Sequence, residues 1–140
     1  MDSSVRVNAY WLREFLWATG WHIDADDHPL NRLNMENATS RALLCENYLI
    51  PELNDLSVVQ QRMVKETLRY ALNFFSKKEW EWYTQDALPD ITDTPEEMFA
   101  DLWGMLFPGE PWHLDSDEGY FRHDDREDAL FLDRYRYGRF

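Results

Sequence analysis

The residues that could do chemistry in this chain are carboxylates and histidines, and most of the carboxylates gather in one stretch. Residues 79–128 hold 16 of the 27 acidic residues and only two basic ones, Arg122 and Arg126, so their formal charge is 2 − 16 = −14. The remaining residues are nearly neutral, because the whole chain carries −13. Charge concentrated in this way indicates a surface that attracts cationic partners, and it carries no information about the fold.

A metal site is the first chemistry that the acids and histidines of 113–125 suggest. A calcium loop that began at Asp115 would need an oxygen ligand at its fifth position, glycine at its sixth and glutamate at its twelfth. This chain has Gly119, Tyr120 and Arg126 at those positions. The spacing therefore excludes an ordinary calcium loop.

Zinc binding and nucleophilic catalysis have little more support. His113, Asp115 and His123 could hold zinc, but their spacing is not diagnostic of a zinc site. A nucleophile would have to be Cys45, which falls on the apolar side of a predicted helix beside Glu46, an acid that raises the pKa of a thiol. We therefore predict a non-enzymatic protein with no cofactor, no metal and no catalytic residue. The alternative is an enzyme or metal-binding protein that uses His113, His123 and nearby acids.

Composition favours a folded, mostly α-helical domain. The chain is 44% hydrophobic and 16% aromatic, and its 140 residues suit one domain with a sizeable core. Few valines, isoleucines and threonines are present, which argues against a sheet. A single cysteine and the lack of a long apolar run predict a cytoplasmic protein that is not embedded in a membrane. The negative charge disfavours direct binding of nucleic acid.

Two helices are predicted in the first third of the chain. Asn8 can cap a helix that runs to about Thr19, with Gly20 ending it. That helix is apolar almost all round, so it lies in the core or is covered by a partner, and its pairing with a second copy in a homodimer stays an alternative. After a loop over 20–36, a helix over 36–49 would bury Ala38, Ala42, Cys45 and Leu49 and end before Pro51.

Three further helices follow. The clearest periodicity predicts an amphipathic helix between Ser57 and Phe75, with a possible ion pair between Arg62 and Glu66. Ser76 and Glu79 match a capping box that opens a helix to Ala87.

The last predicted helix begins where Thr94 caps and Pro95 takes the first helical position, and it runs to about Leu106. Residues 112–128 are predicted to form a loop that is rich in acids and has aromatic residues between them. Residues 129–137 fit either a short helix or a C-terminal strand or hairpin. The expected fold is thus a single compact domain over 1–140 with about five helices.

The acidic stretch is interpreted as a protein-binding surface. Carboxylates displayed outward with aromatics between them can imitate the phosphates of a duplex and occupy a basic nucleic-acid-binding channel. The residues predicted to contact the partner are Glu96, Glu97, Asp101, Asp115, Asp117, Glu118, Asp124, Asp125, Glu127 and Asp128, with Trp82 and Tyr120 as aromatic anchors.

In size, charge and lack of catalytic motifs the chain is similar to the small acidic inhibitors that phages encode, of the anti-CRISPR and anti-restriction type. This similarity of overall type implies a partner with a basic surface in a nucleic-acid-handling complex. An immunity-type inhibitor that masks a basic toxin is the alternative. A solvated acidic face that serves only solubility is the simplest explanation for many of these residues.

Overall fold

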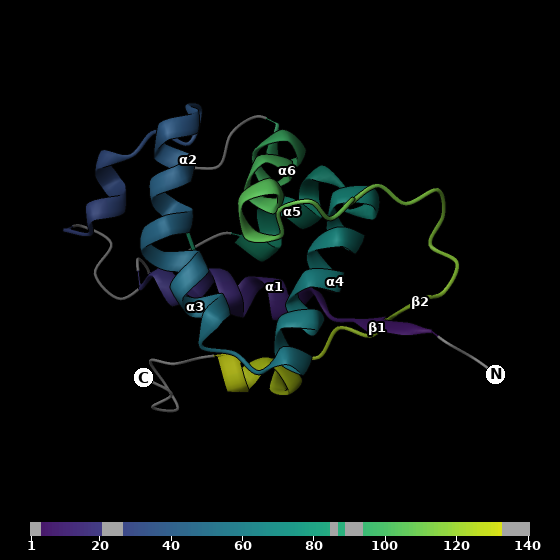
Figure 1. Ribbon diagram of the computed structural model, residues 1–140. Coiled ribbons are helices and arrows are strands. Elements are labelled where there is room, and N and C mark those ends of the chain that lie inside the picture. Colours follow the sequence, from purple (N-terminus) through teal and green to yellow (C-terminus); the bar gives the residue numbers. More distant parts are fainter. Residues whose placement is uncertain (1–3, 21–26, 85–86, 89–93, 133–140) are drawn as a thin grey trace.

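The computed structural model describes residues 4–20, 27–84, 87–88 and 94–132, and most of them are helical. The helices are α1 (Ala9–Leu16), α2 (Ala38–Leu44), α3 (Ile50–Asn54), α4 (Val58–Phe74), α5 (Lys77–Thr84) and α6 (Pro95–Leu106). Two three-residue strands, β1 (Val5–Val7) and β2 (Tyr120–Arg122), form the sheet. The prediction of a mostly α-helical fold is confirmed (Figure 1).

Helix α1 lies at the centre of the core, as its apolar sequence predicts. The side chain of Asn8 accepts a hydrogen bond from the backbone N–H of Tyr10, which caps the helix. A 3₁₀ turn over Trp17–Thr19 continues the helix to Gly20, whose φ of 76° lies in the left-handed region that favours glycine. Helix α1 packs against α4 and α5, and its buried residues include Trp11, Leu12, Phe15 and Leu16.

The end predicted at Pro51 is wrong, because the helix continues past it. A π-helical turn over Cys45–Leu49 joins α2 to α3, and Pro51 lies in the first turn of α3. A proline ring normally clashes with the carbonyl four residues earlier, and the wider π turn changes the backbone where that carbonyl lies. Ala38 is exposed, so the predicted buried stripe begins later, with Leu44 and Cys45.

Helices α4 and α5 begin at capping boxes. Ser57 and Gln60 satisfy each other's backbone N–H groups at α4, and Ser76 and Glu79 do the same at α5. Both helices lie where the sequence predicts them, although α5 ends at Thr84 rather than at Ala87.

The ion pair predicted between Arg62 and Glu66 is wrong. Glu66 instead contacts Arg69, with the nearest N and O atoms 2.5 Å apart, and accepts a hydrogen bond from the hydroxyl of Tyr120. Arg62 is left exposed.

Helix α6 has Pro95 at its first position, but its cap differs from the prediction. The Thr94 hydroxyl makes no bond to a helix N–H and instead donates to the Glu97 carboxylate over 3.2 Å. The buried side of α6 includes Phe99, whose ring stacks on Trp80 of α5 with centroids 4.6 Å apart. Aromatic stacking therefore joins α5 to α6 across the core.

The sheet is the element that sequence reasoning misses. Strands β1 and β2 pair in parallel, with Val5 opposite Tyr120 and Val7 opposite Arg122, so residues 112–128 are not all loop. Beyond β2, a 3₁₀ turn covers Glu127–Leu132, and the rest of the ambiguous segment 129–137 lies outside the described residues.

Candidate acidic interaction surface

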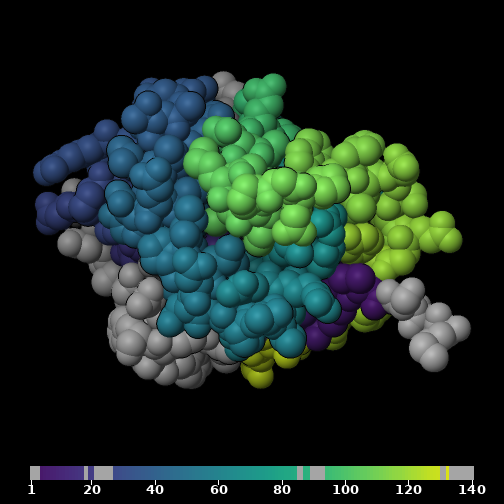
Figure 2. Space-filling view, viewed as in Figure 1, coloured from purple at the N-terminus to yellow at the C-terminus, as the bar shows by residue number. Residues whose placement is uncertain are grey.

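The loop over residues 107–119, named the acidic loop, carries three exposed carboxylates of the predicted set. It leaves the C-terminal end of α6 and runs along one edge of the molecule to β2 (Figures 1 and 2). Asp115, Asp117 and Glu118 are exposed, and the Asp115 side chain is fully so. Among the described residues, no lysine or arginine pairs with any of the three. His113 lies 3.4 Å from Asp115 and is itself largely exposed.

Partly buried hydrogen bonds hold the acidic loop against the helices. The Trp103 indole N–H of α6 donates to the Glu110 carbonyl over 2.6 Å. Asn73 of α4 donates to the Trp112 carbonyl and accepts from the Leu114 N–H, both over 2.9 Å. These bonds satisfy backbone groups that would otherwise be lost to burial, so the loop's backbone has a defined path. In the sequence, Asn73 looks like one more polar residue on the outer face of a helix.

Tyr120, one of the predicted anchors, is half-buried and engaged within the fold. Its hydroxyl donates to Glu66 over 2.7 Å, and its ring lies 5.8 Å from that of Tyr70. Burial and the hydrogen bond to Glu66 raise the pKa of Tyr120, outweighing the opposite effect of Arg69. Tyr120 thus secures the C-terminal end of the acidic loop to α4.

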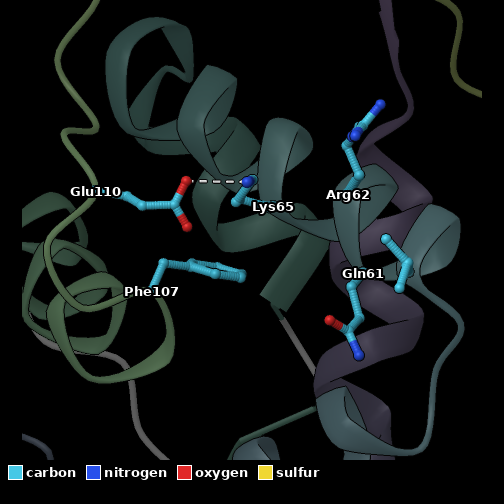
Figure 3. Close-up of a pocket in the computed structure, with 6 residues that line it drawn as sticks. Gln61, Arg62, Lys65, Phe107 and Glu110 are labelled. Carbon is cyan, nitrogen blue, oxygen red and sulfur yellow. Dashed lines mark hydrogen bonds and ion pairs between the residues drawn. The ribbon is translucent and has the colours of Figure 1, made fainter.

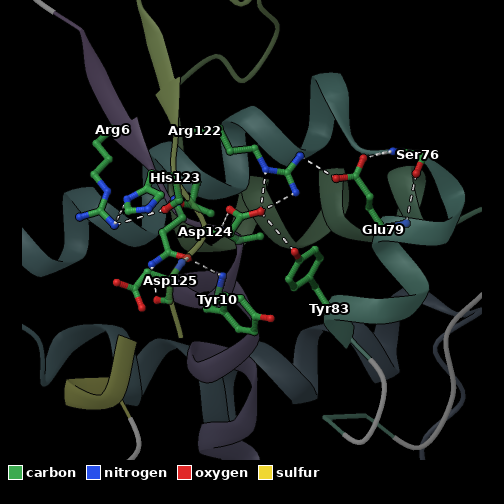
Figure 4. Close-up of polar contacts among 12 residues, drawn as sticks. Arg6, Tyr10, Ser76, Glu79, Tyr83, Arg122, His123, Asp124 and Asp125 are labelled. Atoms are coloured by element: carbon green, nitrogen blue, oxygen red, sulfur yellow. Dashed lines mark hydrogen bonds and ion pairs between the residues drawn. The ribbon is translucent and has the colours of Figure 1, made fainter. Parts of the chain in front are cut away.

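Asp124 lies inside a network that ties the segment after β2 to α1 and α5 (Figure 4). One carboxylate oxygen accepts the N–H of Ala9 over 2.9 Å, at the N-terminus of α1, where the helix dipole favours a negative charge. The other accepts the Tyr83 hydroxyl over 3.2 Å and the Nε–H of Arg122 over 3.0 Å. Arg122 also pairs with Glu79 of α5, with N and O atoms 2.6 Å apart.

The network raises the pKa values of Arg122 and Tyr83. Burial opposes the charge of Arg122, but hydrogen bonds to Asp124 and Glu79 outweigh it and raise its pKa. Burial and the adjacent Asp124 charge also raise the pKa of Tyr83. These carboxylates pair with a partly buried arginine, so they contribute to the fold rather than to a free negative surface.

Asp125 and Asp128, close to Asp124 in sequence, contact Asn8 and Arg6 near the start of the chain. The Asn8 side chain donates to the Asp125 carbonyl over 2.8 Å and accepts from the Asp125 N–H over 3.1 Å. Asp128 pairs with Arg6 of β1, whose guanidinium also faces His123. Glu127 is exposed. A cation facing His123 disfavours a metal ion there, and the described residues contain no group of three or more metal ligands.

The remaining predicted contacts lie on α5 and α6. Glu96 and Glu97 are exposed on the first turn of α6, whereas Asp101 faces α2 and pairs with Arg41 over 3.5 Å. Trp82 of α5 is 56% exposed, so it is accessible to a partner. Figure 1 shows α6, the acidic loop and the 3₁₀ turn after β2 on different sides of the molecule. The predicted residues therefore form separate groups rather than one continuous face.

Cys45 does not offer a nucleophile. It is fully buried, and burial, together with the charges of Asp101 and Glu46, raises its pKa to about 12. A thiol in this setting stays protonated at neutral pH, which confirms the interpretation of Cys45 as a small core residue.

Comparisons with known proteins add no identity: no family model, no curated protein and no solved structure matches this chain. Within the described residues, no helix is long and apolar enough to span a bilayer.

Proposed function

We propose that this protein is a stoichiometric inhibitor that uses the acidic loop to occupy a basic surface of a nucleic-acid-handling complex. The observation that carries the proposal is the exposure of Asp115, Asp117 and Glu118 without a compensating lysine or arginine among the described residues. Exposed carboxylates at the edge of a folded body attract a cationic groove over a Debye length of about 8–10 Å.

The way the loop is held supports a binding role over simple solubility. Solubility needs charge but no particular backbone path, whereas Asn73, Trp103 and Tyr120 fix the loop at several points. A backbone that is already ordered loses less conformational entropy when a partner binds. The loop thus presents its carboxylates in a set arrangement, as a phosphate backbone does.

Some of the acids predicted to contact the partner are already engaged by cations within the fold. Asp124 pairs with the partly buried Arg122, whereas Asp128 pairs with Arg6 at the surface and Asp101 pairs with Arg41. We place the partner contact on Asp115, Asp117 and Glu118, with Glu127, Glu96 and Glu97 as outlying charges. Trp82 lies on α5 and would serve as an anchor for a partner that extends beyond the loop.

The test compares two variants that change net charge equally. D115N/D117N/E118Q removes three carboxylates from the acidic loop, and D27N/E36Q/E46Q removes three exposed ones elsewhere, so both change −13 to −10. Proteins of a bacterial extract are bound to DNA-cellulose at low salt, and the purified wild-type chain is added as a competitor. We expect it to release a nucleic-acid-binding protein, which mass spectrometry identifies.

The loop variant should release far less of that protein, and the control variant as much as the wild type. With the purified partner, surface plasmon resonance should show association slowed by about tenfold for the loop variant at low salt, and the difference should vanish at high salt. Equal release by the two variants would remove the acidic loop from the interface. Failure of the wild type to release any protein would refute nucleic-acid mimicry.

A further inference from the structure

A pocket with a local positive charge lies between α4 and the turn that follows α6. It has a volume of about 170 Å³ and is lined by Val58, Gln61, Arg62, Lys65, Phe107 and Glu110. Figure 3 shows Phe107 and Glu110 on one side and the α4 residues on the other. The pocket shares Phe107 and Glu110 with the acidic loop, but it includes none of Asp115, Asp117 or Glu118, the carboxylates proposed to contact the basic partner.

The walls of the pocket are firmly built. The backbone turns back after α6, where the Glu110 N–H donates to the Phe107 carbonyl over 3.1 Å and Gly109 has a φ of 83°. The Trp103 indole holds the carbonyl of Glu110, as described above. Phe107 itself is buried and forms an apolar floor. On the opposite side, the capping box of Ser57 fixes the first turn of α4.

Apolar surface continues from the pocket onto the outside of α4. Val58 is 75% exposed and Val59 is 68% exposed, and they are two of the few large apolar side chains of the described residues that face solvent. Two adjacent exposed valines leave apolar area in water that a partner would cover. This area extends beyond what a small molecule inside the pocket would contact, so a polypeptide is the better match.

The polar groups of the pocket select an anion. The lining contains two cations, Arg62 and Lys65, and one acid, Glu110, so it carries +1 in a chain of −13. Lys65 pairs with Glu110 over 3.0 Å, and an ammonium has three donors, which leaves two for a ligand. Arg62 is exposed and makes no ion pair among the described residues, so its side chain is free to turn toward a carboxylate bound at Lys65.

We infer that this pocket binds the C-terminal residue of a partner polypeptide that has an aliphatic side chain. A C-terminal residue joins an apolar side chain and a carboxylate at one Cα, which matches a pocket lined by Phe107 and Val58 together with Lys65 and Arg62. Arginine and lysine donate charge-assisted hydrogen bonds to a carboxylate. The exposed valines of α4 would contact the partner residues that precede its C-terminal residue. The C-terminal carboxylate is the group that the site recognises.

The test uses N-acetyl-Ala-Ala-Leu with a free carboxylate and the same peptide with a C-terminal amide. Binding is followed by NMR from the backbone amides of 58–65 and of Phe107, Gly109 and Glu110, and from the Trp103 indole N–H, which contacts Glu110. We expect millimolar binding of the free acid and about tenfold weaker binding of the amide, since a charged hydrogen bond is lost.

Three variants and one control variant sharpen the result. Arg62→Gln should weaken the free acid severalfold and leave the amide unchanged, whereas Arg32→Gln, at another exposed arginine, should change neither. Val58→Ser should weaken both peptides. Glu110→Gln should tighten the free acid, because it removes the carboxylate that competes for Lys65. Equal binding of the acid and the amide, no shift with either at about 10 mM, or unchanged binding in Arg62→Gln would overturn the inference.

Discussion

Replacing Asp124 with asparagine tests whether the acids after β2 belong to the fold or to the surface. The carboxylate accepts hydrogen bonds from the Ala9 N–H, the Tyr83 hydroxyl and the Arg122 guanidinium. Asparagine keeps the shape but loses the charge, and its NH₂ group cannot accept from any of these donors. If Asp124 belongs to the fold, the variant loses stability even though it also lowers the excess negative charge.

The magnitude follows from the three bonds. A hydrogen bond to a charged group contributes about 1.5–3 kcal/mol and a neutral one about 0.5–1.5 kcal/mol, so each bond loses about 1 kcal/mol. Solvent reaches part of the Asp124 side chain and screens its interaction with Arg122, which reduces the sum. We expect D124N to lower the free energy of unfolding by about 2 kcal/mol. At a urea m-value of about 1.5–2 kcal/mol/M, the midpoint falls by about 1 M.

The assay is urea unfolding followed by tryptophan fluorescence, with D115N as the matched control because that carboxylate is fully exposed. The control should keep the wild-type midpoint. R122Q alone and R122Q/D124N complete a double-mutant cycle, which should show a favourable coupling between the two residues. If D124N unfolds at the same urea concentration as the wild type, the reasoning from the network is refuted.

Four other perturbations follow from single contacts. N73A should leave every carboxylate in place but remove the bonds that hold the backbone of the acidic loop. The rate of partner dissociation should therefore rise by a larger factor than the rate of association falls. A change in the association rate alone would contradict this role of Asn73. Cys45 should react with a disulfide reagent at pH 8 only as fast as the chain unfolds, and prompt reaction would disprove its burial. The pKa values of Tyr83 and Tyr120 are raised in the folded state, so these hydroxyls stay protonated to a higher pH than in the unfolded chain. The free energy of unfolding should therefore fall as pH rises above about 10. Urea titrations should show a smaller fall with pH for Y83F or Y120F than for the wild type. W82Q should keep the unfolding midpoint of the wild type and weaken partner binding, whereas a large loss of stability would mean that Trp82 is part of the core.

Features set by residues close in sequence were predictable. Asn8, Ser57 and Ser76 cap helices because each side chain reaches an N–H within three residues, so four or five letters suffice to see the cap. The same local reasoning failed at Pro51, where the π turn before it absorbs the proline. It also failed for Arg62, because Glu66 found partners in Arg69 and the distant Tyr120.

Features that join distant parts of the chain gave no local signal. The register between Val5 and Tyr120 depends on how the 107–119 loop crosses α4, and three-residue strands are too short to show an alternating pattern. The carboxylate at the start of α1 is Asp124, 115 residues away in sequence, so no motif near Ala9 could reveal it. Counting charges in the sequence identified the acidity of this segment, but it could not identify the arginines with which those acids pair.

These contacts change what the net charge of the stretch means. Asp124 and Glu79 share Arg122, and Asp128 takes Arg6, so these acids balance cations that the fold itself brings close. If only the formal charge of −14 over residues 79–128 mattered, every acid of the stretch would contribute equally to attracting a partner. A partner that reads the surface can respond strongly only to carboxylates whose field is not cancelled within a few ångströms. Asp115, Asp117 and Glu118 meet that condition among the described residues, and for this reason three neutralising substitutions in one loop should outweigh three made elsewhere.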